Sequence, residues 1–362
     1  MGRHHTPTKP DTPEKLAVQD RSALRTTVLA LAGLTVFVVA MVASYSGAFA
    51  KPVLHHMTVA VAAPPPIVDG LRAHDSLQVN EVGDAAAARD QVLQRRADTA
   101  LALTPDHRLD IYVAGGGGHS VAAAAETVGR AVADQAGLPA VVTDVAPTAA
   151  GDPTGTVEFY AVIFVSIGAS LGAALLGRLM GAVRSPLMFG LRTLSLSAFS
   201  AVLAVVVTFY ADQVLGALTG HPWQVFGVLW LYAMAVAGAV TGVAAAFGSA
   251  ASVLLGLFLV VVGNAAAAGP VGRPLLSGFY SLFSTIVPQG SGVSLLRSMS
   301  YFDGHGASAP LATLLIWAGS GCVLAVLATA ARLNYRAGYE RIAGWRGSDR
   351  AVLRPRLLPS AD

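Results

Sequence analysis

The sequence predicts a polytopic α-helical membrane protein with six transmembrane helices and a small α/β extracytoplasmic domain between helices 1 and 2. Of its 362 residues, 54% are hydrophobic and only 12% are charged, and the mean hydropathy is +0.59. A soluble domain has about a quarter of its residues charged. Uncharged apolar stretches recur that reach the ~20 residues needed to cross a bilayer. The segment 51–155 differs, because its patterns are those of short strands and helices.

The first predicted span is Thr26–Ala50, and residues 1–25 form a tail with five basic side chains. The end of this span, Ala48-Phe49-Ala50, resembles the small-residue cleavage site of a signal peptide. A signal peptide, however, has an apolar core of ~7–15 residues. The uncharged run here is 25 residues long. We therefore favour an uncleaved anchor, with cleavage as the open alternative.

Residues 51–155 are expected to fold as an α/β domain. Alternating apolar residues predict strands at 57–64, 76–83, 99–105, 108–116 and 140–147. Ala-rich stretches with helix start and stop signals predict helices at 84–97 and 119–137. A segment of about a hundred residues is large enough to hold its own core.

Two features of this domain invite a binding interpretation that the sequence does not favour. The run Gly115–Gly118 precedes a helix, and helix N-termini bind anions. A P-loop needs a lysine after glycine, which none of the three lysines provides, so a strand-to-helix turn is preferred. His55 and His56 are adjacent and would point to opposite faces of a strand. They are expected to be surface residues rather than metal ligands.

Five further spans are predicted after this domain. The middle of each lacks Asp, Glu, Lys, Arg and His, and Glu158 and Asp212 fall at outer ends. Ion-coupled carriers use ionisable groups inside the membrane, so their absence disfavours a secondary carrier. The single cysteine, Cys322, allows no disulfide within the chain. The predicted spans are Val157–Gly177, Thr193–Ala211, Trp223–Phe247, Ser249–Ala268 and Pro310–Ala331.

The distribution of Lys and Arg predicts the orientation in the plasma membrane. The first 25 residues hold five, the loop 178–192 holds three, and seven follow the last span. Since cytoplasmic loops are rich in Lys and Arg, both termini and the loop 178–192 are expected to be cytoplasmic. The five-helix transmembrane domain then occupies 156–335, and 336–362 form a basic cytoplasmic tail.

Two patterns within the membrane domain suggest contacts. Small residues at four-residue spacing let helices approach closely. The predicted packing positions are Gly168, Gly172, Gly238, Gly242 and Gly256. The loop 177–193 mixes three arginines with large apolar side chains. Such a segment can lie on the lipid surface or dock a partner protein with its apolar face.

The stretch "GNAAAAGPVGRPLLSGFYSLFSTIVPQGSGVSLLRSMSYF" (263–302) is apolar but broken by prolines and glycines. Together with "DVAPTAAGDPTGTVEFY" (144–160) and the order of one span, an outer domain and five spans, it resembles the membrane subunits of type-2 ABC exporters. The resemblance is nearest to the phage-infection-protein-like (YhgE/Pip-like) branch. It covers most of residues 25–335.

This resemblance implies a re-entrant hairpin at about 269–300, with Arg297 at the outer headgroup level. Irregular backbone at membrane depth requires a protein-lined environment. An amphipathic loop lying flat on the outer surface is the alternative. The implied segment contains Pro270, Pro274, Phe279, Tyr280, Phe283, Pro288 and Arg297. The resemblance also makes the cytoplasmic loop a coupling element for a separate ATPase, through Arg178, Leu179, Met180, Arg184, Leu187, Met188 and Phe189.

The resulting expectation is a permease subunit that exports an amphipathic or lipid-like substrate. It would work as a homodimer or paired subunit within membrane lipid, beside a cytoplasmic ABC ATPase. The alternative is a non-transporting receptor or scaffold whose outer domain binds a ligand. No catalytic constellation, cofactor motif, metal site or nucleic-acid motif is recognisable, so an enzyme is not expected. Abundant Ala, Gly and Arg with few Lys is typical of high-GC, actinobacterial-like genomes.

Overall fold

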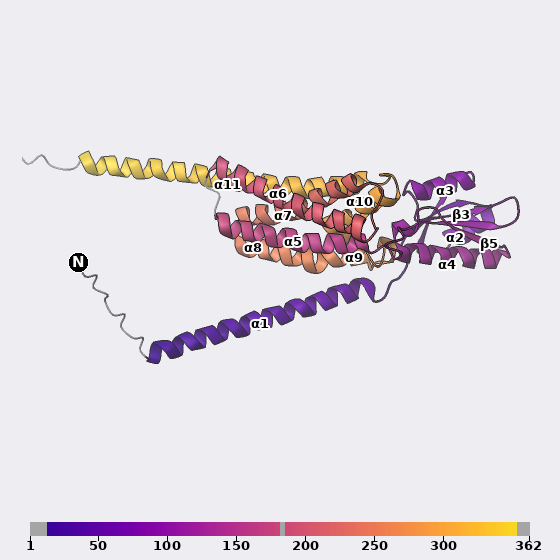
Figure 1. Ribbon diagram of the computed structural model, residues 1–362, viewed down its shortest axis with the longest axis horizontal. Coiled ribbons are helices and arrows are strands. Elements are labelled where there is room, and N and C mark those ends of the chain that lie inside the picture. Colours follow the sequence, from indigo (N-terminus) through magenta and orange to yellow (C-terminus); the bar gives the residue numbers. More distant parts are fainter. Residues whose placement is uncertain (1–12, 182–184, 353–362) are drawn as a thin grey trace, which may run out of the picture.

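The computed structural model describes residues 13–181 and 185–352. Figure 1 shows an elongated molecule with an α/β domain at one end and a helical bundle beside it. We call the end of the bundle next to the α/β domain the domain end, and the other the far end. Helix α1 (Pro13–Phe49) touches the bundle near the domain end and diverges from it toward the far end.

The described residues contain five helices long and apolar enough to cross a membrane. They lie within α1, α5 (Val157–Met180), α6 (Pro186–Phe209) with the π-helical turn η2 (Tyr210–Val214), α7 (Pro222–Phe247) and α11 (Ser308–Val352). These match five of the predicted spans. Helix α7 is the centre of the bundle, since it packs against α5, α6, α8, α10 and α11.

The predicted sixth span, Ser249–Ala268, is shorter than expected. Helix α8 (Ser249–Phe258) continues as the π-helical turn η3 (Leu259–Gly263), and the regular apolar helix Ser249–Gly263 then gives way to a turn. At 1.5 Å per residue, these residues cover roughly 22 Å, less than the ~30 Å hydrocarbon core of a bilayer. The helix ends early because Gly269, Pro270 and Gly272 follow it.

The α/β domain contains the five predicted strands. They are β1 (Met57–Ala62), β2 (Leu77–Glu81), β3 (Thr99–Leu103), β4 (Leu109–Val113) and β5 (Ala140–Asp144), in the sheet order β2-β1-β3-β4-β5. Strand β1 is parallel to β2 and β3, and β5 is parallel to β4, whereas β3 and β4 are antiparallel. The short connection between β3 and β4 permits that reversal.

Helices cover both faces of this sheet. Helix α3 (Ala85–Leu93) packs on one face against Ala60, Ala100 and Ala102. Helices α2 (Pro65–Arg72) and α4 (His119–Ala136) cover the other face. The two predicted helices are confirmed, but α2 was not predicted. Its prolines suit the first turn of a helix, where backbone N–H groups have no helical partner, and they concealed the short amphipathic helix that follows.

Helix α3 begins at a side-chain cap. Asp84 Oδ1 accepts a hydrogen bond from the Ala87 backbone N–H at 2.7 Å. Replacing Asp84 with Ala is expected to lower the free energy of unfolding by about 1 kcal/mol, because the N–H loses its partner. Chemical unfolding of the purified protein measures this loss. Asp90→Ala, on an exposed position of the same helix, is the control, and an equal loss there would contradict the capping explanation.

The core of the α/β domain continues into the bundle. One apolar cluster joins Val59, Val61 and Leu101 of the sheet to Ala265, Ala268, Val271 and Leu276 of the segment after η3, and to Ala48 of α1. The domain and the bundle therefore share buried apolar surface rather than a flexible tether.

Candidate functional site

The predicted broken segment forms short helices where the domain meets the bundle. These are η4 (Arg273–Leu275), α9 (Gly278–Ile286) and α10 (Pro288–Tyr301). Pro274 lies in η4, and Pro288 opens α10 in the first-turn position that suits proline. Pro270 lies in the turn before η4. Helix α10 packs against α5, α7, α9 and α11, so much of this broken segment is enclosed by protein.

The predicted aromatic residues of this segment cluster on α9. Phe279 lies against Tyr280 and Phe283, with ring centroids 5.1 and 4.7 Å apart. The Tyr280 hydroxyl is hydrogen-bonded to Ser44 Oγ of α1 at 3.0 Å, and Ser44 Oγ also donates to the Val261 carbonyl in η3. Helix α9 thus contacts the part of α1 that approaches the bundle.

Arg297 of α10 connects the main parts of the molecule. Its side chain donates hydrogen bonds to the carbonyls of Gly117 in the α/β domain, Gly155 before α5, and Ala268 and Gly269 after η3, at 3.1–3.4 Å. The residue is only 4% exposed. The structure encloses the guanidinium, because carbonyls from three separate segments surround it. The expected level of Arg297 at the outer headgroups stays a prediction.

Arg95 provides a second contact from the α/β domain. Its Nη1 donates to the Ser294 carbonyl at 2.7 Å and to Ser298 Oγ, both on α10. The guanidinium also lies 5.1 Å from the Phe302 ring centroid, within range of a cation–π interaction. Burial, aided by the positive charge of Arg297 and opposed by Asp98, lowers the pKa of Arg95 to about 10. Arg95 therefore remains charged at neutral pH.

The glycine run 115–118 forms the turn η1 (Gly115–Gly117) before α4, as predicted. A Cβ on Gly116 would lie 2.5 Å from the Tyr301 ring, so the absent side chain lets the domain approach α10 closely. The Gly115 N–H donates to Asp144 at 3.1 Å, so this turn is occupied by contacts within the chain. Its glycines therefore serve close packing between the domain and the bundle.

Glu158, in the first turn of α5, lies beside this junction. It was predicted at the outer end of a span, but the structure buries it completely. The Tyr301 hydroxyl interacts with this carboxylate, although neither group makes a hydrogen bond of ordinary geometry among the described residues. The charge of Arg297 acts on this carboxylate, although the two do not form an ion pair within 4 Å among the described residues. The junction therefore encloses both a carboxylate and a guanidinium in its interior.

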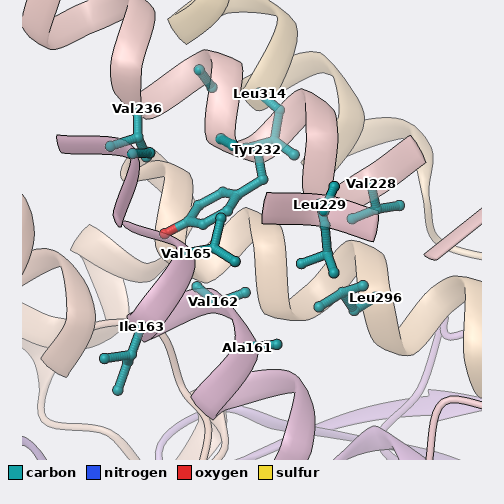
Figure 2. Packing of buried hydrophobic residues seen from close by; sticks show 14 of the residues in the cluster. Ala161, Val162, Ile163, Val165, Val228, Leu229, Tyr232, Val236, Leu296 and Leu314 are labelled. Atoms are coloured by element: carbon teal, nitrogen blue, oxygen red, sulfur yellow. The ribbon is translucent and has the colours of Figure 1, made fainter. Parts of the chain in front are cut away.

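A second polar group lies inside the bundle, and we call it the polar seam: Ser166, Tyr232, Asn264 and Gln289. All four residues are 0% exposed. Gln289 Nε2 donates to Ser166 Oγ at 3.2 Å and to the Leu259 carbonyl at 3.0 Å. The Tyr232 hydroxyl interacts with the Ser166 side chain, and Asn264 with the Tyr45 hydroxyl, although neither contact reaches ordinary hydrogen-bond geometry; Gln289 Oε1 has no hydrogen-bond partner among the described residues. Figure 2 shows the Tyr232 side chain within the apolar cluster that includes Val162, Val165 and Val236.

Neither the polar seam nor the clamping role of Arg297 was predicted from the sequence. Asn264 and Gln289 are neutral, so a search for charges inside the spans passed over them. One sequence feature could have indicated the polar seam, namely amide side chains in an apolar stretch. Burying such a group in a bilayer interior costs free energy, so its presence there needs an explanation. The partners of Arg297 are more than 25 residues away in the sequence and are backbone atoms, so no residue pattern marks them.

Four of the five predicted packing glycines have close neighbours. Gly168 faces Leu203 and Gly172 faces Phe199, both on α6. Gly238 and Gly242 of α7 face the backbone of α11, where Gly321 meets them. A Cβ on Gly256 would have no neighbour within 4 Å among the described residues, so its packing role stays a prediction. Its spacing resembled a packing motif, but α8 turns that face away from the described helices.

The predicted coupling loop lies at the far end of the bundle. Arg178 and Leu179 are exposed at the end of α5, and Leu187 is exposed in the first turn of α6, whereas Met180, Met188 and Phe189 are half-buried. Ser185 Oγ caps α6 by accepting from the Met188 N–H at 3.2 Å. Arg184 lies outside the described residues. The segment leaves large apolar side chains uncovered beside basic ones.

No family model, curated protein or solved structure matches the chain. Within the described ranges, no group of three or more His, Cys, Asp or Glu side chains could hold a metal ion. His55 and His56 are exposed, as expected. Any functional conclusion therefore depends on the geometry of the chain itself.

Proposed function

We propose that this chain is the membrane subunit of an ABC-type exporter that moves an amphipathic or lipid-like substrate outward. The observation that carries this proposal is that the α/β domain packs against the bundle. The two parts share an apolar core and are joined by the hydrogen bonds of Arg95 and Arg297. A movement of α10 must displace the domain, because the arginine contacts connect them. A membrane anchor for a binding domain needs only one helix and no such union.

In this proposal, the far end of the bundle faces the cytoplasm and meets a separate ATPase through the segment 178–192. Uncovered Leu179 and Leu187, beside basic side chains, supply a surface suited to a partner protein. The α/β domain lies outside the cell. Two copies of the chain, or this chain with a related subunit, would enclose the substrate. An amphipathic substrate fits a bundle whose described spans carry no charged side chain at mid-length.

A specific observation also favours the receptor or scaffold as a second candidate. Among the described residues, the edge strands β2 and β5 of the sheet have no strand paired on their outer side, and Val141 of β5 is exposed. An open edge can accept an extended segment of a partner protein. In that case, the detergent-solubilised chain would bind a ligand through β5 without any ATPase.

Affinity purification from native membranes in mild detergent tests the exporter proposal. We expect an ABC ATPase to co-purify at near-equal stoichiometry. Leu187→Asp should reduce its recovery at least fivefold without changing the thermal stability of the chain, because the side chain is 73% exposed and a charge there disrupts apolar docking. Val141→Asp, at an exposed apolar site in the α/β domain, is the control. Absence of any ATPase after gentle cross-linking would contradict the proposal.

A further inference from the structure

The polar seam draws its four members from different parts of the bundle. Ser166 comes from α5, Tyr232 from α7 and Gln289 from α10, while Asn264 directly follows η3. A Cβ on Gly263 would lie 2.5 Å from Gln289 Oε1, so the glycine leaves the room that the amide occupies. Four elements therefore place neutral hydrogen-bonding groups, two of them amides, together in the interior of the bundle.

The described arrangement leaves these groups poorly satisfied. The Tyr232 hydroxyl, Gln289 Oε1 and the amide atoms of Asn264 expose less than 1 Å² each, and none of them makes a hydrogen bond of ordinary geometry among the described residues. Buried polar groups in proteins are almost always paired with protein or ordered water. Three weakly paired side chains of this kind would gain hydrogen bonds in a second arrangement that hydrates them or brings them a ligand.

The local backbone supports such a second arrangement. The seam adjoins the π-helical turn η3, and π-helical turns occur frequently at functional sites. Asn264 follows this turn directly, and Gln289 donates to the carbonyl of its first residue, Leu259. A shift between η3 and α10 would break that hydrogen bond and move the segment that carries Asn264 relative to Gln289. The element that opens the seam is thus the segment joining α8 to α10.

We propose that the polar seam lines a water-accessible pathway inside the subunit, closed in this structure, that accepts uncharged hydrogen-bonding groups. Its weakly paired atoms include donors and acceptors but no charge, which matches hydroxyl or amide groups of a substrate, and water in their absence. The use of this pathway by a substrate rests on the proposed export function. The opening of the pathway to water is measured without any transport assay.

Cysteine accessibility tests the pathway, because Cys322 is the only native cysteine. In a Cys322→Ala background, Ser166→Cys and Asn264→Cys are placed in membrane vesicles and treated with 2-hydroxyethyl methanethiosulfonate, a small, uncharged and water-soluble thiol reagent. Ala204→Cys in α6, also 0% exposed, is the matched buried control outside the seam. We expect both seam cysteines to react at least tenfold faster than the control.

Reaction of the seam cysteines at the rate of the control would overturn the proposal, because the seam would then be a permanently dry core. Ser166→Cys is nearly isosteric, so it remains informative if Asn264→Cys fails to fold. Repeating the reaction with a soluble alkyl glycoside present, whose headgroup carries only hydroxyls, tests the ligand class: protection supports it, and no protection overturns it. The cysteine-accessibility experiment uses no ATPase, so its result does not depend on whether an ATPase co-purifies with the chain.

Discussion

Arg297→Met is expected to weaken the contact between the α/β domain and the bundle and to lower the free energy of unfolding by about 3–5 kcal/mol, the range for breaking a buried charged interaction. Methionine is similar in length but cannot donate hydrogen bonds. It leaves the carbonyls of Gly117, Gly155, Ala268 and Gly269 facing each other without the cation that holds them. Glu158 would also lose the nearby positive charge that acts on it.

Thermal unfolding in detergent and limited proteolysis of the linker 145–156 measure this effect. Arg273→Met is the matched control, because Arg273 is exposed on the same broken segment. Arg297→Lys should recover only part of the stability, since one ammonium cannot replace the planar, multi-donor guanidinium. Equal stability and equal proteolysis of the Arg297 and Arg273 variants would show that the arginine does not clamp the domain.

Gly321→Leu is expected to prevent normal packing of α11 on α7. A Cβ at position 321 would overlap the backbone of Gly238 and Ala239, and backbone cannot move aside as a flexible side chain can. Overpacking usually costs about 1–3 kcal/mol, and a clash with backbone belongs at or above the upper end of that range. The expected result is little monodisperse protein on size-exclusion chromatography and a lower thermal midpoint for what remains.

Gly319→Leu provides the control on the same helix. A Cβ added at position 319 would have no heavy atom within 4 Å, so the new side chain extends away from the described helices. We expect this variant to purify like the unchanged protein. If both variants behave alike, then the loss reflects the general cost of a larger residue, and the contact between α7 and α11 is not close.

Local patterns were sufficient to predict much of this fold. Strand alternation located β1–β5, and the acidic residue Asp84 marked the start of α3. The length of α8 was harder to predict, because apolar composition continues past Gly263 although the regular helix does not. A span predicted from hydropathy alone does not register the glycines and prolines that end it.

The candidate site was predicted less completely, for a physical reason. Arg297 was identified as a rare charge in an apolar stretch, but its acceptors are backbone carbonyls that every sequence carries. Gly321 was missed because its partners, Gly238 and Gly242, lie on another helix, so no spacing within α11 reveals the contact. Contacts made across elements require the arrangement of those elements to be known.

The shared core has a consequence for how the protein is made. The sheet strands β1 and β3 are synthesised early, but Ala265, Ala268 and Leu276, which complete their apolar cluster, follow more than 150 residues later. At a synthesis rate of about 5–20 residues per second, the nascent α/β domain waits on the order of ten seconds with that surface uncovered. Its last folding step is therefore coupled to membrane insertion of the later helices, and a chain that stops before residue 265 exposes an apolar face for chaperones and proteases to recognise.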